Sequence, residues 1–108
     1  MYARVIKFTF INQFSKEATT SLLNNLVTKK GFSQGMIFRV TIDTSETQRY
    51  SVTVWPNKQG SDKTWKSFAE NVLTQIKDTG AKVETTFGPI DEINVSKDFD
   101  FSKYKLRN

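Results

Sequence analysis

Hydrophobic and polar residues alternate along four stretches of the chain, and apolar residues recur three and four positions apart along two others. The alternating stretches are rich in β-branched and aromatic residues, which is typical of strands; they are residues 2–11, 36–43, 48–55 and 82–87. The helical spacing is carried first by Ala18, Leu22, Leu23, Leu26 and Val27, and later by Trp65, Phe68, Ala69, Val72, Leu73 and Ile76. The pattern therefore predicts the order strand, helix, strand, strand, helix, strand.

Turn and capping residues set the expected boundaries of these elements. Ser15 is expected to cap the first helix and Gly31 to end it, because glycine adopts a left-handed backbone easily. Ser61 or Asp62 is expected to cap the second helix, with Gly80 as its end. The short polar link over residues 44–47 predicts a hairpin, and Pro56 ends its second strand.

The element order predicts an α+β, ferredoxin-like βαββαβ sandwich. Its four-stranded antiparallel sheet would carry both helices on one face, because the helical crossovers are right-handed. Residues 1–95 form the single expected domain, with a short fifth strand over 90–95. Residues 96–108 form a polar C-terminal tail that either packs on a dimer partner, packs locally or is disordered; its apolar residues are Phe99, Phe101, Tyr104 and Leu106.

Alternation also predicts which side chains face the helices, with the first strand the least secure because both of its faces are partly apolar. The set expected against the helices is Ile6, Phe8, Phe10, Met36, Phe38, Val40, Ile42, Tyr50, Val52, Val54, Val83, Thr85 and Phe87. The set expected on the helix-free face is Val5, Lys7, Thr9, Ile37, Arg39, Thr41, Ser51, Thr53, Trp55, Lys82, Glu84 and Thr86.

The polar groups among the second set suggest a ligand pocket on the helix-free face. Lys7 and Arg39 could hold an anionic or carbonyl-bearing ligand, and Trp55 could stack on a flat ring. Ser51 and Thr53 are secondary hydrogen-bond donors. The alternative is that Lys7 and Arg39 pair with Glu84 or face water, while Trp55 fills an interface.

Composition excludes several chemistries. The 108 residues contain no cysteine and no histidine, so a thiol nucleophile, a thiolate zinc site and a Ser-His-Asp triad are impossible. Neither a GxxxxGK[ST] loop nor a GxGxxG turn is present. Asp and Glu do not cluster as metal ligands would, so we expect neither a metal nor another cofactor, and the catalytic residues stay unidentified.

The order of elements resembles the dimeric α/β-barrel superfamily, in particular antibiotic-biosynthesis-monooxygenase-like domains. The resemblance lies in residues 5–10 (VIKFTF), 50–55 (YSVTVW), 65–70 (WKSFAE) and 88–93 (GPIDEI). It implies a homodimer whose two sheets pack face to face as an eight-stranded barrel, with ligand pockets inside the barrel or between each sheet and its own helices. Members include cofactor-independent oxygenases, muconolactone-isomerase-like enzymes, haem-degrading enzymes that use a histidine absent here, and domains without known activity.

The sequence thus leaves several functions open. One is a small-molecule-binding homodimer, with cofactor-independent monooxygenase chemistry on an aromatic or other electron-rich substrate. The others are a non-catalytic dimerisation or ligand-sensing module and an RNA-binding ferredoxin-like domain. The net charge of +5 is scattered and the RNA-binding strand motif is missing, which disfavours nucleic acid. The start of the chain lacks a signal peptide's apolar run, so we expect a cytoplasmic protein with no membrane partner.

Overall fold

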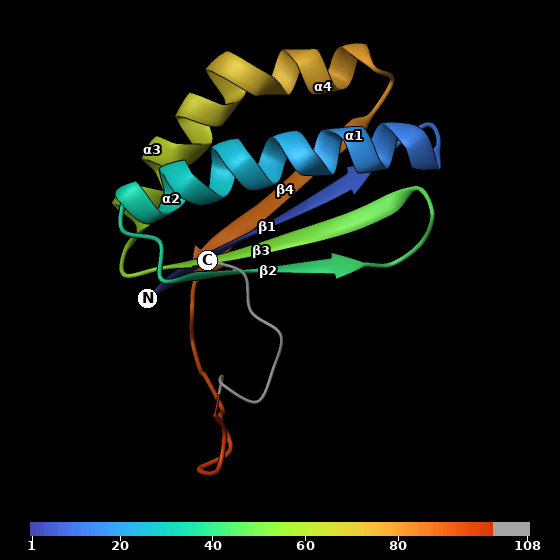
Figure 1. Cartoon of the computed structure of the whole chain (residues 1–108). Helices are drawn as coiled ribbons and strands as arrows, with labels where there is room; N and C mark the ends of the chain where they lie inside the picture. Colours follow the sequence, from blue (N-terminus) through green and yellow to red (C-terminus); the bar gives the residue numbers. More distant parts are fainter. Residues whose placement is uncertain (101–108) are drawn as a thin grey trace.

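The computed structural model describes residues 1–100 and has both helical segments on one face of a four-stranded sheet (Figure 1). The strands are β1 (Tyr2–Thr9), β2 (Phe38–Asp43), β3 (Gln48–Trp55) and β4 (Lys82–Pro89). Their order across the sheet is β2-β3-β1-β4, and every neighbouring pair is antiparallel. The predicted ferredoxin-like βαββαβ fold is confirmed.

Each helical segment is continuous but contains a wider π-helical turn at its middle. The first consists of α1 (Gln13–Leu23), η1 (Asn24–Thr28) and α2 (Lys29–Ser33). The second consists of α3 (Lys58–Phe68), η2 (Ala69–Leu73) and α4 (Thr74–Asp78). Single π turns inside α-helices occur frequently at functional sites.

The helices begin and end elsewhere than predicted, except at Gly80. Asparagines cap both N-termini, because the Asn12 side chain accepts from the Ser15 amide (2.8 Å) and Asn57 accepts from the Gly60 amide (3.3 Å). Gly31 lies inside the helix, where its missing side chain leaves room for Met36. The positive φ that ends the first segment belongs to Gly35, and Gly80 has the same role after the second.

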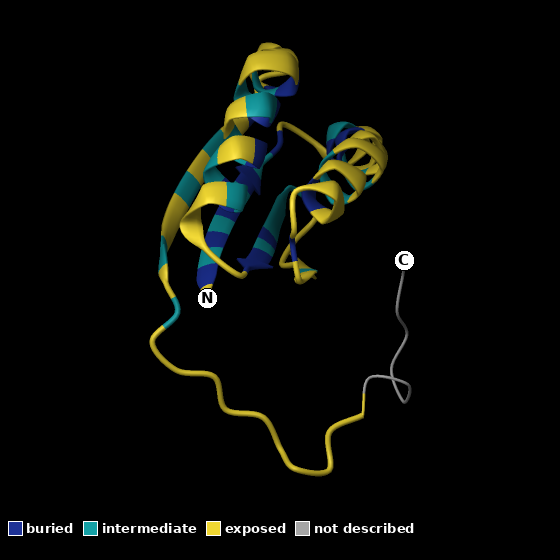
Figure 2. Ribbon diagram, turned by 90° about the vertical axis from the view of Figure 1, so that its left-hand side faces the viewer, coloured by how far each residue is buried: buried dark blue, intermediate teal, exposed yellow. Residues whose placement is uncertain are grey.

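The hydrophobic core lies between the sheet and the helices. Its buried members come from β1, from the two helical segments and from the residues that flank them: Ile6, Phe8, Phe10, Leu23, Phe68, Val72, Ile76 and Ala81. Figure 2 shows the buried residues on the inner sides of the layers. A second, smaller cluster joins Tyr2, Met36 and Trp55 at the end of the sheet where β1 begins.

The faces of β1 and β4 are as predicted, but those of β2 and β3 are reversed. Ile6 of β1 faces the core, and its register partner on β3 is Ser51. Residues paired across neighbouring strands share a face, so Ser51, Thr53 and Trp55 face the helices together with Arg39 and Thr41 of β2. One residue of register exchanges the two faces of a strand.

The helix-free face is consequently more apolar than predicted. Its rows across the sheet read Phe38–Val54–Ala3, Val40–Val52–Val5 and Ile42–Tyr50–Lys7. The side chains of the edge strand β2 leave much of their surface in water, with exposed fractions of 37% for Phe38, 45% for Val40 and 47% for Ile42.

The fifth strand predicted over residues 90–95 does not form. Residues 90–96 have no regular structure, and the segment leaves the sheet on the side opposite the helices (Figure 1). Ile90 is still tied to the sheet by a hydrogen bond from its amide to the Met1 carbonyl (2.9 Å). Phe99 is partly exposed, while Phe101, Tyr104 and Leu106 of the predicted tail lie outside the described residues.

Candidate functional site

A charged residue of β1 points into the space between the sheet and the helices. Arg4 is 4% exposed and has the same strand parity as Ile6 and Phe8. Its Nε donates to Ser61 Oγ (3.0 Å), and its Nη2 donates to Asp62 Oδ1 (3.1 Å), at the start of α3. The guanidinium lies 4.5 Å from the ring centre of Phe87 and 5.1 Å from that of Trp65. Burial lowers the pKa of Arg4, and the Asp62 charge opposes that shift.

Arg39 of β2 reaches into the same space. Its Nε donates to Ser51 Oγ (2.9 Å), and its Nη1 donates to Asn24 Oδ1 and Thr28 Oγ1 (3.0 Å each). Asn24 and Thr28 are the first and last residues of the π turn η1. The turn therefore places two side-chain oxygens where both accept a hydrogen bond from Nη1 of Arg39. No carboxylate among residues 1–100 forms an ion pair with Arg39.

The electrostatic surroundings of Arg39 are unfavourable to its charge. Burial, together with the nearby positive charge of Arg49, lowers the pKa of Arg39 to about 10. Arg39 therefore stays protonated at neutral pH. Arg49 donates to Thr20 Oγ1 (2.7 Å), and no described residue accepts from its buried Nε.

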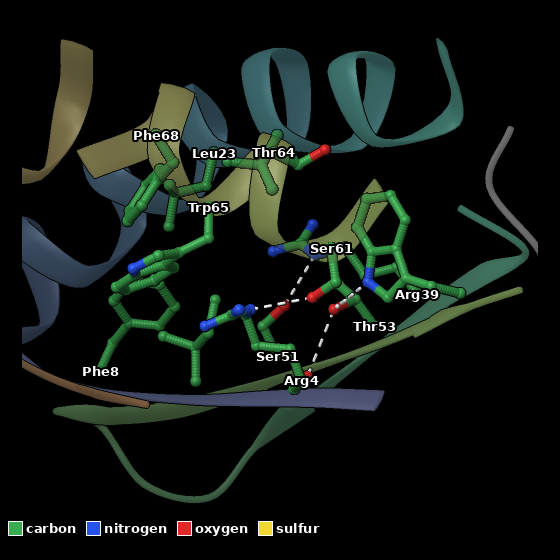
Figure 3. A pocket seen from close by; sticks show the side chains of 13 residues that line it. Arg4, Phe8, Leu23, Arg39, Ser51, Thr53, Ser61, Thr64, Trp65 and Phe68 are labelled. Atoms are coloured by element: carbon green, nitrogen blue, oxygen red, sulfur yellow. Dashed lines mark hydrogen bonds between the residues drawn. The ribbon is translucent and has the colours of Figure 1, made fainter. Parts of the chain in front are cut away.

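Trp55 closes one side of this region. The side chain is 2% exposed, and its Nε1 donates to Thr53 Oγ1 (3.0 Å). The Thr53 hydroxyl in turn donates to the backbone carbonyl of Arg4 (3.3 Å). Figure 3 shows these bonds beside those of Arg4 and Arg39 with the two serines. The chain of bonds fixes the indole and leaves its rings as a rigid wall.

A small cavity lies among these side chains. Its volume is about 20 Å³, which is room for about one water molecule. The lining mixes apolar groups with the arginines, serines and threonines: Arg4, Ile6, Phe8, Leu23, Val27, Arg39, Ser51, Thr53, Trp55, Ser61, Thr64, Trp65 and Phe68.

A larger groove of about 250 Å³ adjoins the cavity between the two helical segments. Leu26, Val27, Phe68 and Val72 form its apolar walls, and the polar residues are Lys30, Thr64, Ser67 and Asn71. Val27, Thr64 and Phe68 line both the groove and the cavity. The groove and the cavity that Arg39 lines are therefore adjacent.

The structure brings four of the five predicted site residues together, on the face opposite to the one expected. Arg39, Ser51, Thr53 and Trp55 line the cavity beneath the helices. Lys7 lies on the helix-free face, with its Nζ 5.9 Å from the ring centre of Tyr50. Glu84 pairs with Lys82 (2.9 Å) rather than with Lys7 or Arg39, and the Lys82 contact lowers the pKa of that carboxyl.

Sequence reasoning missed several residues that line the cavity, most importantly Arg4 and Thr64. Arg4 carried a usable signal, because a charge with the parity of Ile6 and Phe8 must be buried with them. Thr64 stands four residues before Phe68 and therefore shares the inward face of α3. Its hydroxyl is buried and no described residue bonds to it.

Comparison with solved structures supports the fold. A dimeric ferredoxin-like protein from an uncultured marine organism superposes with a TM-score of 0.70 at 13% identity, covering 86% of this chain and 97% of that one. A monooxygenase from the gene ActVA-Orf6 of Streptomyces coelicolor, in complex with nanaomycin D, gives 0.68 at 12% identity, covering 88% and 92%. SnoaB, a cofactor-independent oxygenase from Streptomyces nogalater, gives 0.67 at 10% identity, covering 85% and 94%.

The chain shares its ferredoxin-like fold with these three solved structures. These identities are low, so the likeness extends to the fold alone. No protein-family model matches the chain, and no curated protein matches it by sequence. The resemblance inferred from the order and spacing of elements is confirmed at the level of the fold.

The acidic side chains of residues 1–100 lie apart from one another. No group of three or more Asp and Glu side chains there is close enough to hold a metal ion. None of the helices in this part of the chain has the length and apolar character needed to cross a bilayer.

Proposed function

We propose that the protein is a homodimeric α/β barrel that binds a small aromatic or other electron-rich molecule and oxidises it with dioxygen, without a cofactor. The ligand lies between the sheet and the helices of each protomer, where Arg39, Ser51, Thr53 and Trp55 line the cavity. The observation that carries the proposal is the small cavity that Arg39 lines, together with the adjacent groove between the helices, with which it shares Val27, Thr64 and Phe68.

The second half of the proposal is the dimer. Phe38, Val40 and Ile42 present a half-exposed apolar surface that is costly to leave in water. A second copy would bury it by packing sheet against sheet, which is how a barrel covers a helix-free face. The dimeric ferredoxin-like protein with the same fold supports this arrangement.

The oxidation needs no group beyond the substrate and dioxygen. A phenol ring and O₂ give a quinone and water, and the ring supplies all four electrons that dioxygen accepts. The protein then has three tasks: it binds the ring, removes water from it and holds it in position for dioxygen. The cofactor-independent oxygenase SnoaB, which has this fold, supports the assignment.

A non-catalytic ligand-binding module is the second candidate, and one observation favours it. No Asp, Glu or Tyr lines the cavity or the groove, and the chain contains no histidine. The lining therefore offers no evident general base. Oxidation in this pocket requires a substrate that arrives already ionised, whereas simple binding requires nothing more.

Two measurements test the proposal. Size-exclusion chromatography with light scattering is expected to give twice the 12.4 kDa mass of the chain. Oxygen uptake is then followed with a panel of polyphenols and the wild-type protein, with heat-denatured protein as the control. Uptake above the control supports the oxygenase. A dimer that binds polyphenols without oxygen uptake favours the non-catalytic ligand-binding module. A monomer that retains RNA favours the nucleic-acid alternative.

A further inference from the structure

We infer that the pocket selects a planar aromatic acid, whose ring lies in the groove between the helices and whose anionic oxygen binds Arg39 and Thr64. This inference rests on the proposed function for the location of the ligand and goes beyond it by naming the ligand's charge. Three observations support it: the positive charge of the residues that line the pocket, the hydrogen-bonding groups of Arg39 and Thr64 that have no partner among residues 1–100, and the volumes of the cavity and the groove.

The charges that line the pocket are all positive. Arg4 and Arg39 line the cavity, Lys30 lines the groove, and no carboxylate lines either one. Asp62 neutralises Arg4 through the 3.1 Å contact, but no described residue forms an ion pair with Arg39. A partly buried charge without a counterion is costly, and an anionic ligand would remove that cost.

Two hydrogen-bonding groups of the pocket are unused by residues 1–100. Arg39 bonds through Nε and Nη1, and no described residue accepts from its Nη2. Thr64 is 6% exposed, and its buried hydroxyl has no partner among the described residues. Buried polar groups are nearly always satisfied, so the Thr64 hydroxyl indicates a missing partner. The Nη2 of Arg39 is not among the buried unsatisfied atoms, and it is a donor that a ligand can use.

The dimensions assign each part of the ligand to a compartment. The cavity of about 20 Å³ accommodates an oxygen-sized group beside Arg39, but no ring. The groove of about 250 Å³ is large enough for one or two fused rings, because a cavity of about 150 Å³ can hold benzene. Leu26, Val27, Phe68 and Val72 would contact the ring faces. Thr64 borders both compartments and so lies where ring and acidic group meet.

The charge of the ligand also fits the absence of a general base. A carboxylic acid is already an anion at neutral pH, so its binding, as distinct from the oxidation of its ring, requires no group in the pocket to remove a proton. Arg39 then holds the anionic form by a charge-assisted hydrogen bond, about twice as strong as a neutral one. Arg39 is in this sense a ligand-binding residue rather than a proton-transfer residue.

The test compares two probes of nearly the same shape, 2-naphthoate and 2-naphthamide, by isothermal titration calorimetry at pH 7 with the full chain. We expect 2-naphthoate to bind at least about tenfold more tightly, the low end of what a hydrogen bond to a charged group contributes. Arg39→Gln is expected to weaken 2-naphthoate by about ten- to hundredfold and to leave 2-naphthamide nearly unchanged. Thr64→Val keeps the shape of the side chain but removes its hydroxyl group. We expect it to weaken the binding of 2-naphthoate by a smaller factor than Arg39→Gln does.

Matched variants separate charge from folding. Lys66→Gln removes the same charge from an exposed position on α3 outside the pocket lining and is expected to leave both affinities unchanged. Arg39→Lys keeps the positive charge. It is therefore expected to retain part of the preference for 2-naphthoate over 2-naphthamide, whereas Arg39→Gln is expected to lose that preference. Circular dichroism of each variant checks the fold.

The outcomes distinguish this inference from the proposed function. Equal affinity for the two probes, or a preference that survives Arg39→Gln in a folded protein, overturns the inference. Failure of both probes to bind, in a dimer that still consumes oxygen with polyphenols, overturns the inference but not the proposed function. A folded monomer that neither binds nor consumes oxygen overturns both.

Discussion

Replacing Val40 by aspartate tests whether the helix-free face is an interface between two copies. Val40 lies at the middle of β2 in the apolar row with Val52 and Val5, and 45% of its surface is exposed in the single chain. In the single chain, Val40→Asp therefore leaves the new carboxylate in contact with water. In the dimer, the same carboxylate would be buried between two sheets.

The magnitude follows from what the dimer buries. Full burial of a valine side chain stabilises by about 1.5–3 kcal/mol, so the half still exposed contributes about 1 kcal/mol per copy. Burying a carboxylate costs several kcal/mol more per copy, and a two-fold interface contains the substitution twice. The total is at least about 5 kcal/mol, which raises the dimer dissociation constant by at least about a thousandfold.

The assay is sedimentation equilibrium over a wide range of protein concentration, with circular dichroism to check the fold. Phe14→Asp is the matched control, because Phe14 is 79% exposed on α1 and far from the helix-free face. We expect folded Val40→Asp to be monomeric and Phe14→Asp to dimerise like the wild type. A folded Val40→Asp protein with an unchanged dissociation constant would refute the reasoning.

Three further substitutions test the packing and electrostatics. Trp55→Ala is expected to lower the free energy of unfolding by about 3–5 kcal/mol in urea denaturation, because Trp55 is fully buried; a loss of less than about 1 kcal/mol would contradict its burial. Gly60→Ala is expected to lower the melting temperature although alanine favours helices, because the new Cβ would lie 2.7 Å from the Gln34 carbonyl oxygen; an unchanged or raised melting temperature would contradict this. The hydrogen bond from Lys16 lowers the pKa of Asp43, so its contribution to stability is present above the ordinary value of 3.8 and is lost as pH falls through the folded-state pKa. Urea denaturation from pH 6 to pH 2 should show wild type and Asp43→Asn converging on acidification, and a constant difference would contradict the assignment.

The fold could be predicted from the sequence because its signals are local. Alternation over 48–55 predicts β3 with the observed bounds, and the four-residue spacing of Phe68, Val72 and Ile76 identifies a helical face that is indeed buried. The helix starts were displaced because each asparagine cap is followed closely by another plausible capping residue: Ser15 comes three residues after Asn12, and Ser61 and Asp62 come four and five residues after Asn57. A cap is identified by the backbone bond its side chain makes, and sequence spacing alone does not choose among nearby candidates.

The faces of β2 and β3 could not be predicted in the same way. In Ser51–Trp55 the valines have one parity and the polar residues plus Trp55 have the other, and the valines were expected against the helices. A sheet that packs against helices on one face and carries apolar side chains on the other has no single polar face. The indole of Trp55 was the better guide, because burying so large a side chain takes Ser51 and Thr53 to the same face.

The site was therefore predicted by residue type but not by place. Arg39, Ser51, Thr53 and Trp55 share one face by parity and pairing, so an error in the face moved them together and kept the cluster intact. Lys7 lies on β1, whose faces were predicted correctly, so it stays on the helix-free face while the other four residues lie beneath the helices. The partners from the helices, Ser61 and Thr64, depend on contacts between elements distant in sequence, which no local pattern contains.

A titration of ¹⁵N-labelled protein with 2-naphthoate, followed by ¹H–¹⁵N correlation spectra, tests most directly where the ligand binds. The chain has two tryptophans, Trp55 and Trp65, and both line the cavity, so their indole N–H signals report on it. The account predicts saturable shifts of these two signals and of the Thr64 amide, with the amides of Val40 and Val52 unmoved. Shifts confined to Val40 and Val52, with both indole signals unchanged, would place the ligand on the helix-free face and contradict the account.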